Sequence, residues 1–374
     1  MKQEYISLGL MSGTSGDGVD ASIIRSDGAT NYEVINDKYF QYEEETQQNI
    51  HNLKDKIKNI KDLEILVKEL RDLERQITLF HSKIIKELND FHEIDIVGFH
   101  GQTIYHNSQE RISSQLGDGI LLSQLTKKDI VFNFRKNDLN NNGEGAPLTP
   151  IFHQLIAKKL KFKLPICILN IGGISNITII NEISKTSDLK SRDIGPGNCM
   201  IDSWVRNNSK KNYDQDGILA AKGKKNDIIF EQAQELFVNR PNQNISTFDV
   251  NDFDTSFARG LSLEDGAATL TDLTANIIGA ALLAFASNNT TKPKKVLVCG
   301  GGRKNKVLIE KIKKVTLKEL IIEPIDQYGV NGDFVESQAF AFLAIRSVLK
   351  LPITFPSTTG CKNPSLGGEI VKAI

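Results

Sequence analysis

Residues 8–20 read LGLMSGTSGDGVD, a run of glycines, hydroxyls and carboxylates that directly follows a short apolar segment. Glycines let backbone N–H groups approach an anion closely, and the hydroxyls of Ser12, Thr14 and Ser15 can donate to it. The carboxylate of Asp17 can hold a hydrated divalent cation. Apolar residues resume after the turn, which favours a second strand over a helix. The stretch therefore predicts a phosphate-binding β-hairpin rather than a P-loop, whose signature the chain lacks.

The composition limits the class of partner. The 374 residues carry 46 Lys plus Arg and 46 Asp plus Glu, so no net charge attracts nucleic acid or an anionic membrane. A chain of this length fits two domains of roughly 150 to 200 residues each. The four cysteines lack C-x-x-C spacing and are typical of reduced thiols. With no signal-peptide pattern and no membrane-length apolar run, we expect a cytoplasmic protein that binds a small molecule and neither nucleic acid nor a membrane.

The glycine hairpin recurs about half a chain later. Residues 166–178 predict a strand, a double-glycine turn at Gly172-Gly173 and a second strand. A third glycine turn, Gly300-Gly301-Gly302, follows the apolar strand 296–299 and precedes a Lys-rich helix. Together the three turns predict two related α/β domains that hold a nucleotide between them.

Several helices are expected from apolar periodicity. Within the charged region 43–90, apolar residues from Leu63 to Leu88 recur three and four positions apart, which predicts one amphipathic helix. The pattern leaves open whether this helix packs on the sheet of its own domain or on a partner helix in a dimer. Further helices are expected over about 266–287 and 334–350.

Polar side chains follow two further apolar strands. The strand 94–99 ends in His100-Gly101-Gln102-Thr103, and the strand 130–134 ends in Arg135. Open α/β sheets bind ligands at the carboxyl ends of their strands. The planar guanidinium of Arg135 can bind a carboxylate or phosphate through two hydrogen bonds, and a structural salt bridge is the alternative. The polar loop 140–147 that follows is interpreted as a domain boundary or hinge.

The three glycine turns resemble those of the actin-like ATPase superfamily, and ten blocks narrow the resemblance. They are Met11-Ser12-Gly13-Thr14-Ser15, Asp17-Gly18-Val19-Asp20, Gly98-Phe99-His100-Gly101-Gln102-Thr103, Phe134-Arg135, Gly145-Ala146-Pro147-Leu148, Leu169-Asn170-Ile171-Gly172-Gly173-Ile174-Ser175-Asn176, Asp193-Ile194-Gly195-Pro196-Gly197-Asn198, Ala268-Thr269-Leu270-Thr271, Cys299-Gly300-Gly301-Gly302 and Gly332-Asp333-Phe334-Val335-Glu336-Ser337-Gln338-Ala339-Phe340-Ala341. In this order and over nearly the whole chain, they resemble the anhydro-N-acetylmuramic acid kinase family.

The resemblance implies an α/β, two-domain actin-like ATPase (ribonuclease H-like) fold with the active site in the interdomain cleft. We expect an N-terminal domain of residues 1–145 and about 350–374, and a C-terminal domain of residues 146–349. The family uses ATP and water to convert 1,6-anhydro-N-acetylmuramic acid into N-acetylmuramic acid 6-phosphate, a step in peptidoglycan recycling. Water adds at the anomeric carbon, and the freed O6 takes the γ-phosphoryl group. A homodimer is expected from the resemblance only.

The resemblance also implies roles for single carboxylates. It places the group that activates water at Asp193, a residue that alternatively caps the helix beginning near Asn198. General-base help of this kind is worth roughly 10² to 10⁴ in rate. It makes Glu336 a second ligand for the sugar or the water, although a carboxylate at a helix start also favours the helix dipole.

The remaining site residues are assigned by the same resemblance. The sugar is expected to contact His100, Gln102, Arg135, Asn198 and Glu336, with the lactyl carboxylate as a candidate partner of Arg135. The nucleotide is expected on two sets of residues, Ser12, Gly13, Thr14, Ser15, Gly16, Asp17, Gly18 and Val19, and Gly172, Gly173, Gly300, Gly301 and Gly302. Mg²⁺ bridges the phosphates near Asp17 through water.

One block departs from the family pattern. Ser246-Thr247-Phe248-Asp249 stands where the family has Ser-Thr-Gly-Arg-Glu. The departure lies on the sugar side and leaves alternatives open: a kinase of another sugar or small carboxylate on the same fold, or a non-catalytic sugar-sensing protein. A filament-forming or chaperone ATPase is a further alternative. The sensing proteins carry an added DNA-binding module, whereas this chain begins its first strand at about Tyr5.

Overall fold

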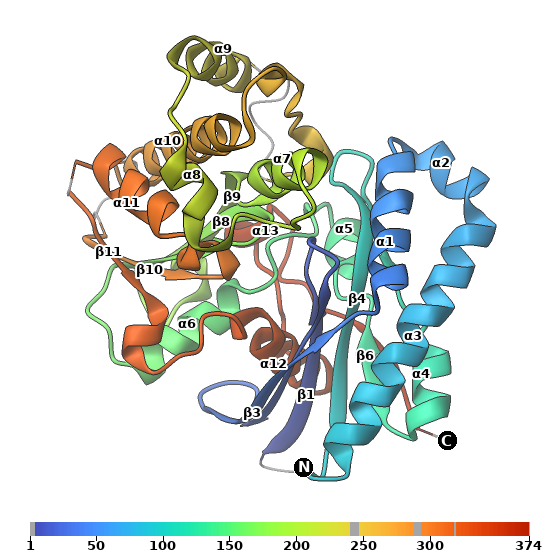
Figure 1. Cartoon of the computed structure of the whole chain (residues 1–374). Helices are drawn as coiled ribbons and strands as arrows, with labels where there is room; N and C mark the ends of the chain where they lie inside the picture. Colours follow the sequence, from blue (N-terminus) through green and yellow to red (C-terminus); the bar gives the residue numbers. More distant parts are fainter. Residues whose placement is uncertain (1–3, 240–246, 288–292, 318, 374) are drawn as a thin grey trace. The chain divides into compact units, whose positions relative to one another are not determined.

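The computed structural model describes residues 4–239, 247–287, 293–317 and 319–373, so Ser246 lies outside the described residues (Figure 1). Two compact units emerge. Unit 1 comprises the chain up to Lys161, residues 183–190 and the chain from Asp333 onward, and unit 2 comprises residues 162–182 and 191–332. This division differs from the expected boundaries at residues 145 and 350, because the helix Val335–Val348 packs on the sheet of unit 1 and the helix Pro150–Lys159 packs on that helix.

Unit 1 contains a mixed sheet with the strand order β12-β6-β4-β1-β2-β3. Its strands are β1 (Tyr5–Ser12), β2 (Gly18–Ser26), β3 (Tyr32–Gln41), β4 (Ile96–Asn107), β6 (Asp129–Phe132) and β12 (Glu369–Val371), with β5 (Ile112–Leu116) paired to β4. β1 pairs antiparallel with β2, as does β2 with β3, whereas β4 runs parallel to β1 and β6 parallel to β4. Met11 lies opposite Asp20 in the first pair, which confirms the predicted hairpin.

The helices of unit 1 include three where the sequence predicted one. They are α1 (Glu44–Lys56), α2 (Ile60–Ile65), α3 (Val67–Asn89), α4 (Gly119–Thr126), α5 (Lys136–Asn140), α6 (Pro150–Lys159), α12 (Val335–Val348) and α13 (Pro356–Thr359). The single helix expected from the apolar spacing of Leu63 to Leu88 was wrong, because Leu66 takes a non-helical conformation between α2 and α3. Asn59 caps the start of α2, with its side chain accepting from the Lys61 amide. Because the apolar spacing continues across the short break, the sequence does not reveal that break.

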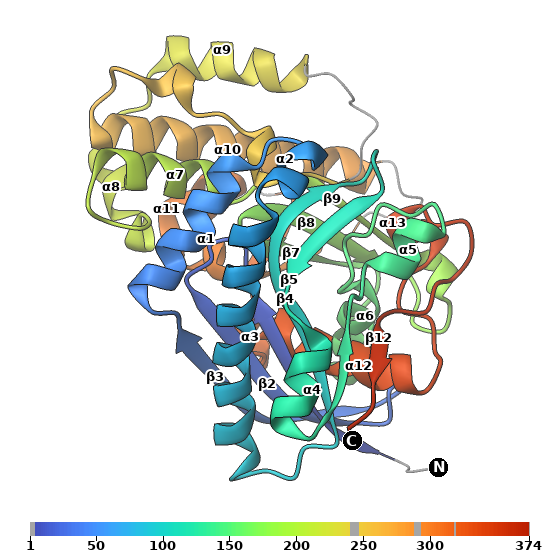
Figure 2. The ribbon, with the colours of Figure 1, turned by 90° about the vertical axis from the view of Figure 1, so that its right-hand side faces the viewer.

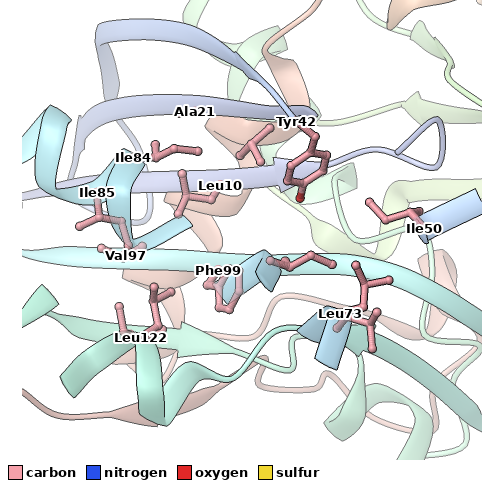
Figure 3. Packing of buried hydrophobic residues seen from close by; sticks show 14 of the residues in the cluster. Leu10, Ala21, Tyr42, Ile50, Leu73, Ile84, Ile85, Val97, Phe99 and Leu122 are labelled. Atoms are coloured by element: carbon pink, nitrogen blue, oxygen red, sulfur yellow. The ribbon is translucent and has the colours of Figure 1, made fainter. Parts of the chain in front are cut away.

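The core of unit 1 lies between its sheet and the helices on one face. Leu10 and Phe99 from the sheet pack with Leu73 of α3 and Ile50 of α1 (Figure 3). Figure 2 shows α3 crossing in front of the sheet, with α12 behind it. Of the two alternatives for the amphipathic region, the structure shows it packed on the sheet of its own unit.

The opposite face of the same sheet carries α12 at very short range. Gly9 of β1 and Gly98 of β4 are neighbours in the parallel pair. A Cβ added at Gly9 would lie closer than 3.0 Å to the Ser337 carbonyl oxygen, and one at Gly98 equally close to that of Phe340. Because strand side chains alternate between faces, these two glycines let the backbone of α12 rest directly on the sheet. This contact fixes the start of α12, where Glu336 lies.

Unit 2 repeats the strand order of unit 1. Its sheet runs β11-β10-β7-β8-β9, built from β7 (Ile166–Ile171), β8 (Ile174–Ile180), β9 (Leu189–Pro196), β10 (Lys295–Cys299) and β11 (Ile321–Pro324). The first strand, β7, pairs antiparallel with β8 on one side and parallel with β10 on the other, as β1 does with β2 and β4. The predicted recurrence of the hairpin is confirmed, and the fold is α/β in both units.

The helices of unit 2 form layers around α10 (Leu263–Ser287). The others are α7 (Cys199–Asn208), α8 (Ile218–Lys222), α9 (Asp227–Val238) and α11 (Lys306–Val315), and short 3₁₀ turns occur at Gln215–Gly217, Val250–Asp252, Ser256–Ala258, Gly301–Lys304 and Ile325–Tyr328. A further 3₁₀ turn, Thr186–Asp188, belongs to unit 1. The expectation of no membrane-length apolar run was wrong for one helix, because the window Leu263–Ala284 is long and apolar enough to cross a membrane, although 67% of it is buried. Ile278 faces the sheet and Leu270 faces the layer of α7 to α9, so α10 is apolar because both sides are covered.

Candidate functional site

The glycines of the first hairpin fall into two groups. Gly16 has a φ of +65°, and a Cβ there would lie 2.8 Å from Ile50. A Cβ at Gly18 would meet the Phe40 carbonyl and Tyr39. A Cβ at Gly13 would meet only the Ser15 hydroxyl, at 3.6 Å. Packing therefore explains Gly16 and Gly18, whereas the free space beside Gly13 is suited to a ligand that approaches the backbone.

The polar side chains of the hairpin divide between its base and its tip. At the base, Ser12 is buried, and its hydroxyl lies 2.8 Å from that of Tyr42. At the tip, Ser15 and Asp17 are exposed, and the Ser15 hydroxyl donates to the Asp17 carboxylate over 2.5 Å. An exposed carboxylate at the tip of a glycine turn fits a cation that keeps most of its water. Thr14 is half-buried between them, and Val19 belongs to the core of unit 1.

Gln102 is built into this hairpin. The residue is fully buried, and its side-chain nitrogen donates to the Gly13 carbonyl over 2.9 Å. Its side-chain oxygen is buried without a hydrogen-bond partner in the described part of the chain. Gln102 was expected to contact the sugar. The structure adds a contact through which Gln102 holds the first glycine hairpin.

His100 lies within β4 rather than beyond its end. The predicted strand end at residue 99 was wrong, because β4 continues to Asn107 and pairs there with β5. The His100 ring donates from Nδ1 to the Gly101 carbonyl (2.8 Å), so Nε2 accepts from the Arg135 guanidinium (3.0 Å). Burial and the charge of Arg135 hold the pKa of His100 well below its usual value, which keeps the ring neutral as this arrangement requires.

Arg135 connects His100 with Glu336. The predicted strand 130–134 is shorter than expected, since β6 ends at Phe132 and Arg135 is the N-cap residue of α5. Arg135 donates to the Gly145 carbonyl over 2.8 Å. Glu336, in the first turn of α12, is half-buried, and burial raises its pKa while the charge of Arg135 opposes that rise. The middle of β4, the start of α5 and the first turn of α12 thus supply an imidazole, a guanidinium and a carboxylate to one cluster.

In unit 2 the turn after Asp193 rests on the second glycine hairpin. The amides of Gly197 and Cys199 donate to the Gly173 carbonyl over 2.8 and 3.1 Å, and the amide of Asn198 donates to that of Gly172 over 2.8 Å. A Cβ at Gly172 would have only an ordinary contact, 3.5 Å from the Ile174 carbonyl. Asn198 is the N-cap residue of α7. This docking holds the predicted nucleotide turn and the segment that carries Asp193 together.

Asp193 is 6% exposed and lies in β9. Its Oδ2 accepts a hydrogen bond of 3.0 Å from the Phe248 amide. The block that departs from the family pattern therefore contacts Asp193 through a backbone donor, a role that no side-chain pattern could have indicated. Phe248 itself packs on Phe253, with ring centres 5.5 Å apart.

The third glycine turn closes against the end of β7. Gly300 has a φ of +80°, and a Cβ there would lie 2.6 Å from the Ile171 carbonyl. A Cβ at Gly302 would collide with the Ile171 side chain. Gly301 is exposed, and a Cβ there would meet nothing within 4 Å. Each of the three turns therefore contains at least one glycine with open space beside it, and these are Gly13, Gly172 and Gly301.

Comparison with known proteins identifies the family of the chain. The family model for anhydro-N-acetylmuramic acid kinase matches residues 4–373. Proteins named anhydro-N-acetylmuramic acid kinase from Pelagibacter ubique and Agrobacterium fabrum are 55% and 36% identical, with complete coverage of both chains in each pair. Among solved structures, a ROK family glucokinase from Streptomyces griseus in complex with glucose and AMPPNP has a TM-score of 0.42 at 11% identity, covering 91% of this chain and 99% of its own. The chain belongs to the anhydro-N-acetylmuramic acid kinase family.

Proposed function

We propose that this chain is an ATP-dependent kinase that opens 1,6-anhydro-N-acetylmuramic acid with water and phosphorylates O6, giving N-acetylmuramic acid 6-phosphate. Family membership over the whole chain supports the substrate. The observation that carries the proposal is Asp193, a buried carboxylate with one oxygen held by a backbone amide, on a segment docked to a glycine hairpin.

Asp193 acts as the general base. With Oδ2 fixed by the Phe248 amide, Oδ1 takes the proton of the attacking water. The water oxygen bonds to the anomeric carbon, and the bond between that carbon and O6 breaks. The electron pair left on O6 attacks the γ-phosphorus, and ADP leaves. The balance is one water and one ATP consumed per sugar phosphate, with one proton released from Asp193.

The residues proposed to bind the sugar are assigned in each unit separately. In unit 1 we assign His100, Arg135 and Glu336, because they form one polar cluster. Arg135 keeps its guanidinium oriented by its bonds to His100 and to the Gly145 carbonyl, which suits it to the lactyl carboxylate. In unit 2 we assign Asn198, which follows the docked turn.

The nucleotide is held by the three open glycines. Amides of the hairpins around Gly13 and Gly172 bind the phosphates, and Gly301 lets the adenosine approach the backbone. Asp17 would hold Mg²⁺ through water, and the cation would supply charge neutralisation for the transferring phosphoryl group. The other residues of the first hairpin, Ser12 to Val19, shape this loop. We also propose a homodimer and a cytoplasmic location, the latter supported by four free cysteines in the structure.

The test is product analysis in heavy-oxygen water. The wild type, with Mg²⁺, ATP and the anhydro sugar, is expected to give a 6-phosphate labelled at the anomeric hydroxyl. Asp193→Asn should lose at least about 10²-fold in rate, while Asp254→Asn, an exposed carboxylate of the same unit, should match the wild type. Absence of product from the wild type, with ATP turnover on another sugar, would overturn the substrate. Full activity of Asp193→Asn would overturn the base.

A further inference from the structure

The carbonyls of the first hairpin are tied down by side chains that lie outside it. Gln102 donates to the Gly13 carbonyl (2.9 Å), Lys54 to the Thr14 carbonyl (2.7 Å) and Gln47 to the Asp17 carbonyl (3.2 Å). Lys54 and Gln47 both come from α1, whose Ile50 also packs against Gly16. The loop is thus held from behind by a helix that lies outside every block of the family resemblance.

This arrangement orients the amides of the hairpin. In a trans peptide the C=O and N–H groups point to opposite sides. When Gln102 and Lys54 hold the carbonyls of Gly13 and Thr14, the next amides, those of Thr14 and Ser15, point away from these two side chains. Successive N–H groups aimed to one side are what an anion-binding turn requires.

Lys54 differs from the two glutamines in charge and burial. Its side chain carries a full positive charge, yet the residue is only 8% exposed. Lysine is among the residues that are rarely buried, because removing an ammonium from water is costly. A neutral amide suffices to hold a carbonyl, as Gln102 shows in the same loop. The Lys54 ammonium, 2.7 Å from the Thr14 carbonyl, places this charge directly behind the turn.

We propose that Lys54 is a positioning residue of the phosphate hairpin, one that orients the peptide between Thr14 and Ser15 and supplies positive charge behind it for the nucleotide phosphates. The inference rests on the proposed function only in that it takes the hairpin to bind phosphate. Because Lys54 acts through that peptide, its contribution to ligand affinity should increase with the number of phosphates beyond the α position. It should contribute nothing to the affinity for the sugar.

The experiment compares Lys54→Met, Lys54→Gln and Lys54→Arg by direct binding of ATP, ADP, adenosine and the anhydro sugar. A hydrogen bond to a charged group accounts for roughly 10- to 100-fold in affinity. Lys54→Met should lose about that factor for ATP, with adenosine and sugar within about twofold. The ATP affinity of Lys54→Gln should fall by most of the same factor. The ATP affinity of Lys54→Arg should lie between those of Lys54→Met and the wild type. Lys56→Met, an exposed lysine of the same helix, should bind like the wild type.

The inference would be overturned if Lys54→Met or Lys54→Gln bound ATP with wild-type affinity. It would also be overturned if a variant lost equal affinity for adenosine and for ATP, because an equal loss indicates a purely structural role. Thermal unfolding of each variant identifies any that fail to fold, and Lys54→Gln and Lys54→Arg still decide the question if Lys54→Met does not fold. Gly13→Ala separates this inference from the proposed function. Unchanged ATP affinity in Gly13→Ala contradicts phosphate binding at the hairpin, whereas a loss there without a loss in Lys54→Met contradicts only the role of Lys54.

Discussion

The amide of Phe248 donates a hydrogen bond of 3.0 Å to Oδ2 of Asp193, in the one block where the chain departs most from its family. Because the donor is a backbone group, the side chain at position 248 can change without loss of this contact. The Phe248 ring is instead used for packing on Phe253. The departure at residues 246–249 is therefore compatible with the chemistry assigned to Asp193.

Replacing the amide donor should impair the reaction more than replacing the ring. Phe248→Pro removes the N–H, and loss of a hydrogen bond to a charged group should lower kcat by about 10- to 100-fold. Phe248→Leu keeps the amide and should stay within about threefold of the wild type. Steady-state kinetics on the anhydro sugar provide the measurement, with thermal unfolding as the check on folding. Equal kcat values for the two variants would show that the donor is unimportant.

Arg135 should control the pH dependence of sugar use. Burial raises the pKa of Glu336 and Arg135 opposes the rise, so Arg135→Met lets that pKa rise further. If the sugar needs the ionised carboxylate, the acidic limb of kcat/KM moves to higher pH. Arg135 also lowers the pKa of His100, so the profile is measured in a His100→Gln background as well. Lys136→Met, an exposed neighbour paired with Glu369, is the control, and a limb at the same pH in all variants contradicts the prediction.

Gly9 should tolerate no side chain. A Cβ there would fall within 3.0 Å of the Ser337 carbonyl. Because this oxygen belongs to the backbone of α12, the clash can be relieved only by moving α12 away from the sheet. Gly9→Ala should therefore cost about 3 kcal/mol or more in free energy of unfolding, the upper range for overpacking. Gly301→Ala, where a Cβ meets nothing within 4 Å, should leave that free energy unchanged. Denaturant unfolding compares the two, and equal stability would contradict the packing argument.

Gly301→Ala should instead affect nucleotide binding. Packing within the chain gives no reason for glycine at this exposed position, so an added methyl group interferes only with a ligand lying against the turn. The KM for ATP should rise by about tenfold, with the KM for the sugar unchanged. Unaltered KM values for both substrates would place the adenosine elsewhere.

The sequence predicts best what is encoded locally. Both glycine hairpins appear where expected, because each strand-turn-strand pattern is complete within about fifteen residues. The ends of β4 and β6 were misplaced because pairing with other strands, not local pattern, decides where a strand ends. The break between α2 and α3 was missed because only one residue, Leu66, leaves the helical conformation while the apolar spacing continues across it.

Site residues were predictable only where a side chain carries the role. Glycines in the turns were identified together, yet only the folded chain separates Gly16, which packing requires, from Gly13, which it does not. Phe248 and Lys54 were missed for different reasons. The first acts through its backbone, and the second lies in a charged helix where lysines are usually solvated.

The buried ring of His81 should make the protein sensitive to acid. Burial lowers its pKa from 6.5 to about 4, while its Nδ1 bonds to the Ile77 carbonyl. Between these two pH values the unfolded chain binds more protons than the folded one, so the free energy of unfolding falls as the pH falls. At pH 5 the loss from this residue is about 2 kcal/mol relative to pH 8. His81→Phe keeps a ring against Phe99 and removes the titration, so its stability should decline less between pH 6.5 and 5. Denaturant unfolding across that range tests this, with pH 7.5 to 8.5 as the internal control where both proteins should change alike. Parallel stability curves from pH 8 to 5 would show that His81 is not the titrating group.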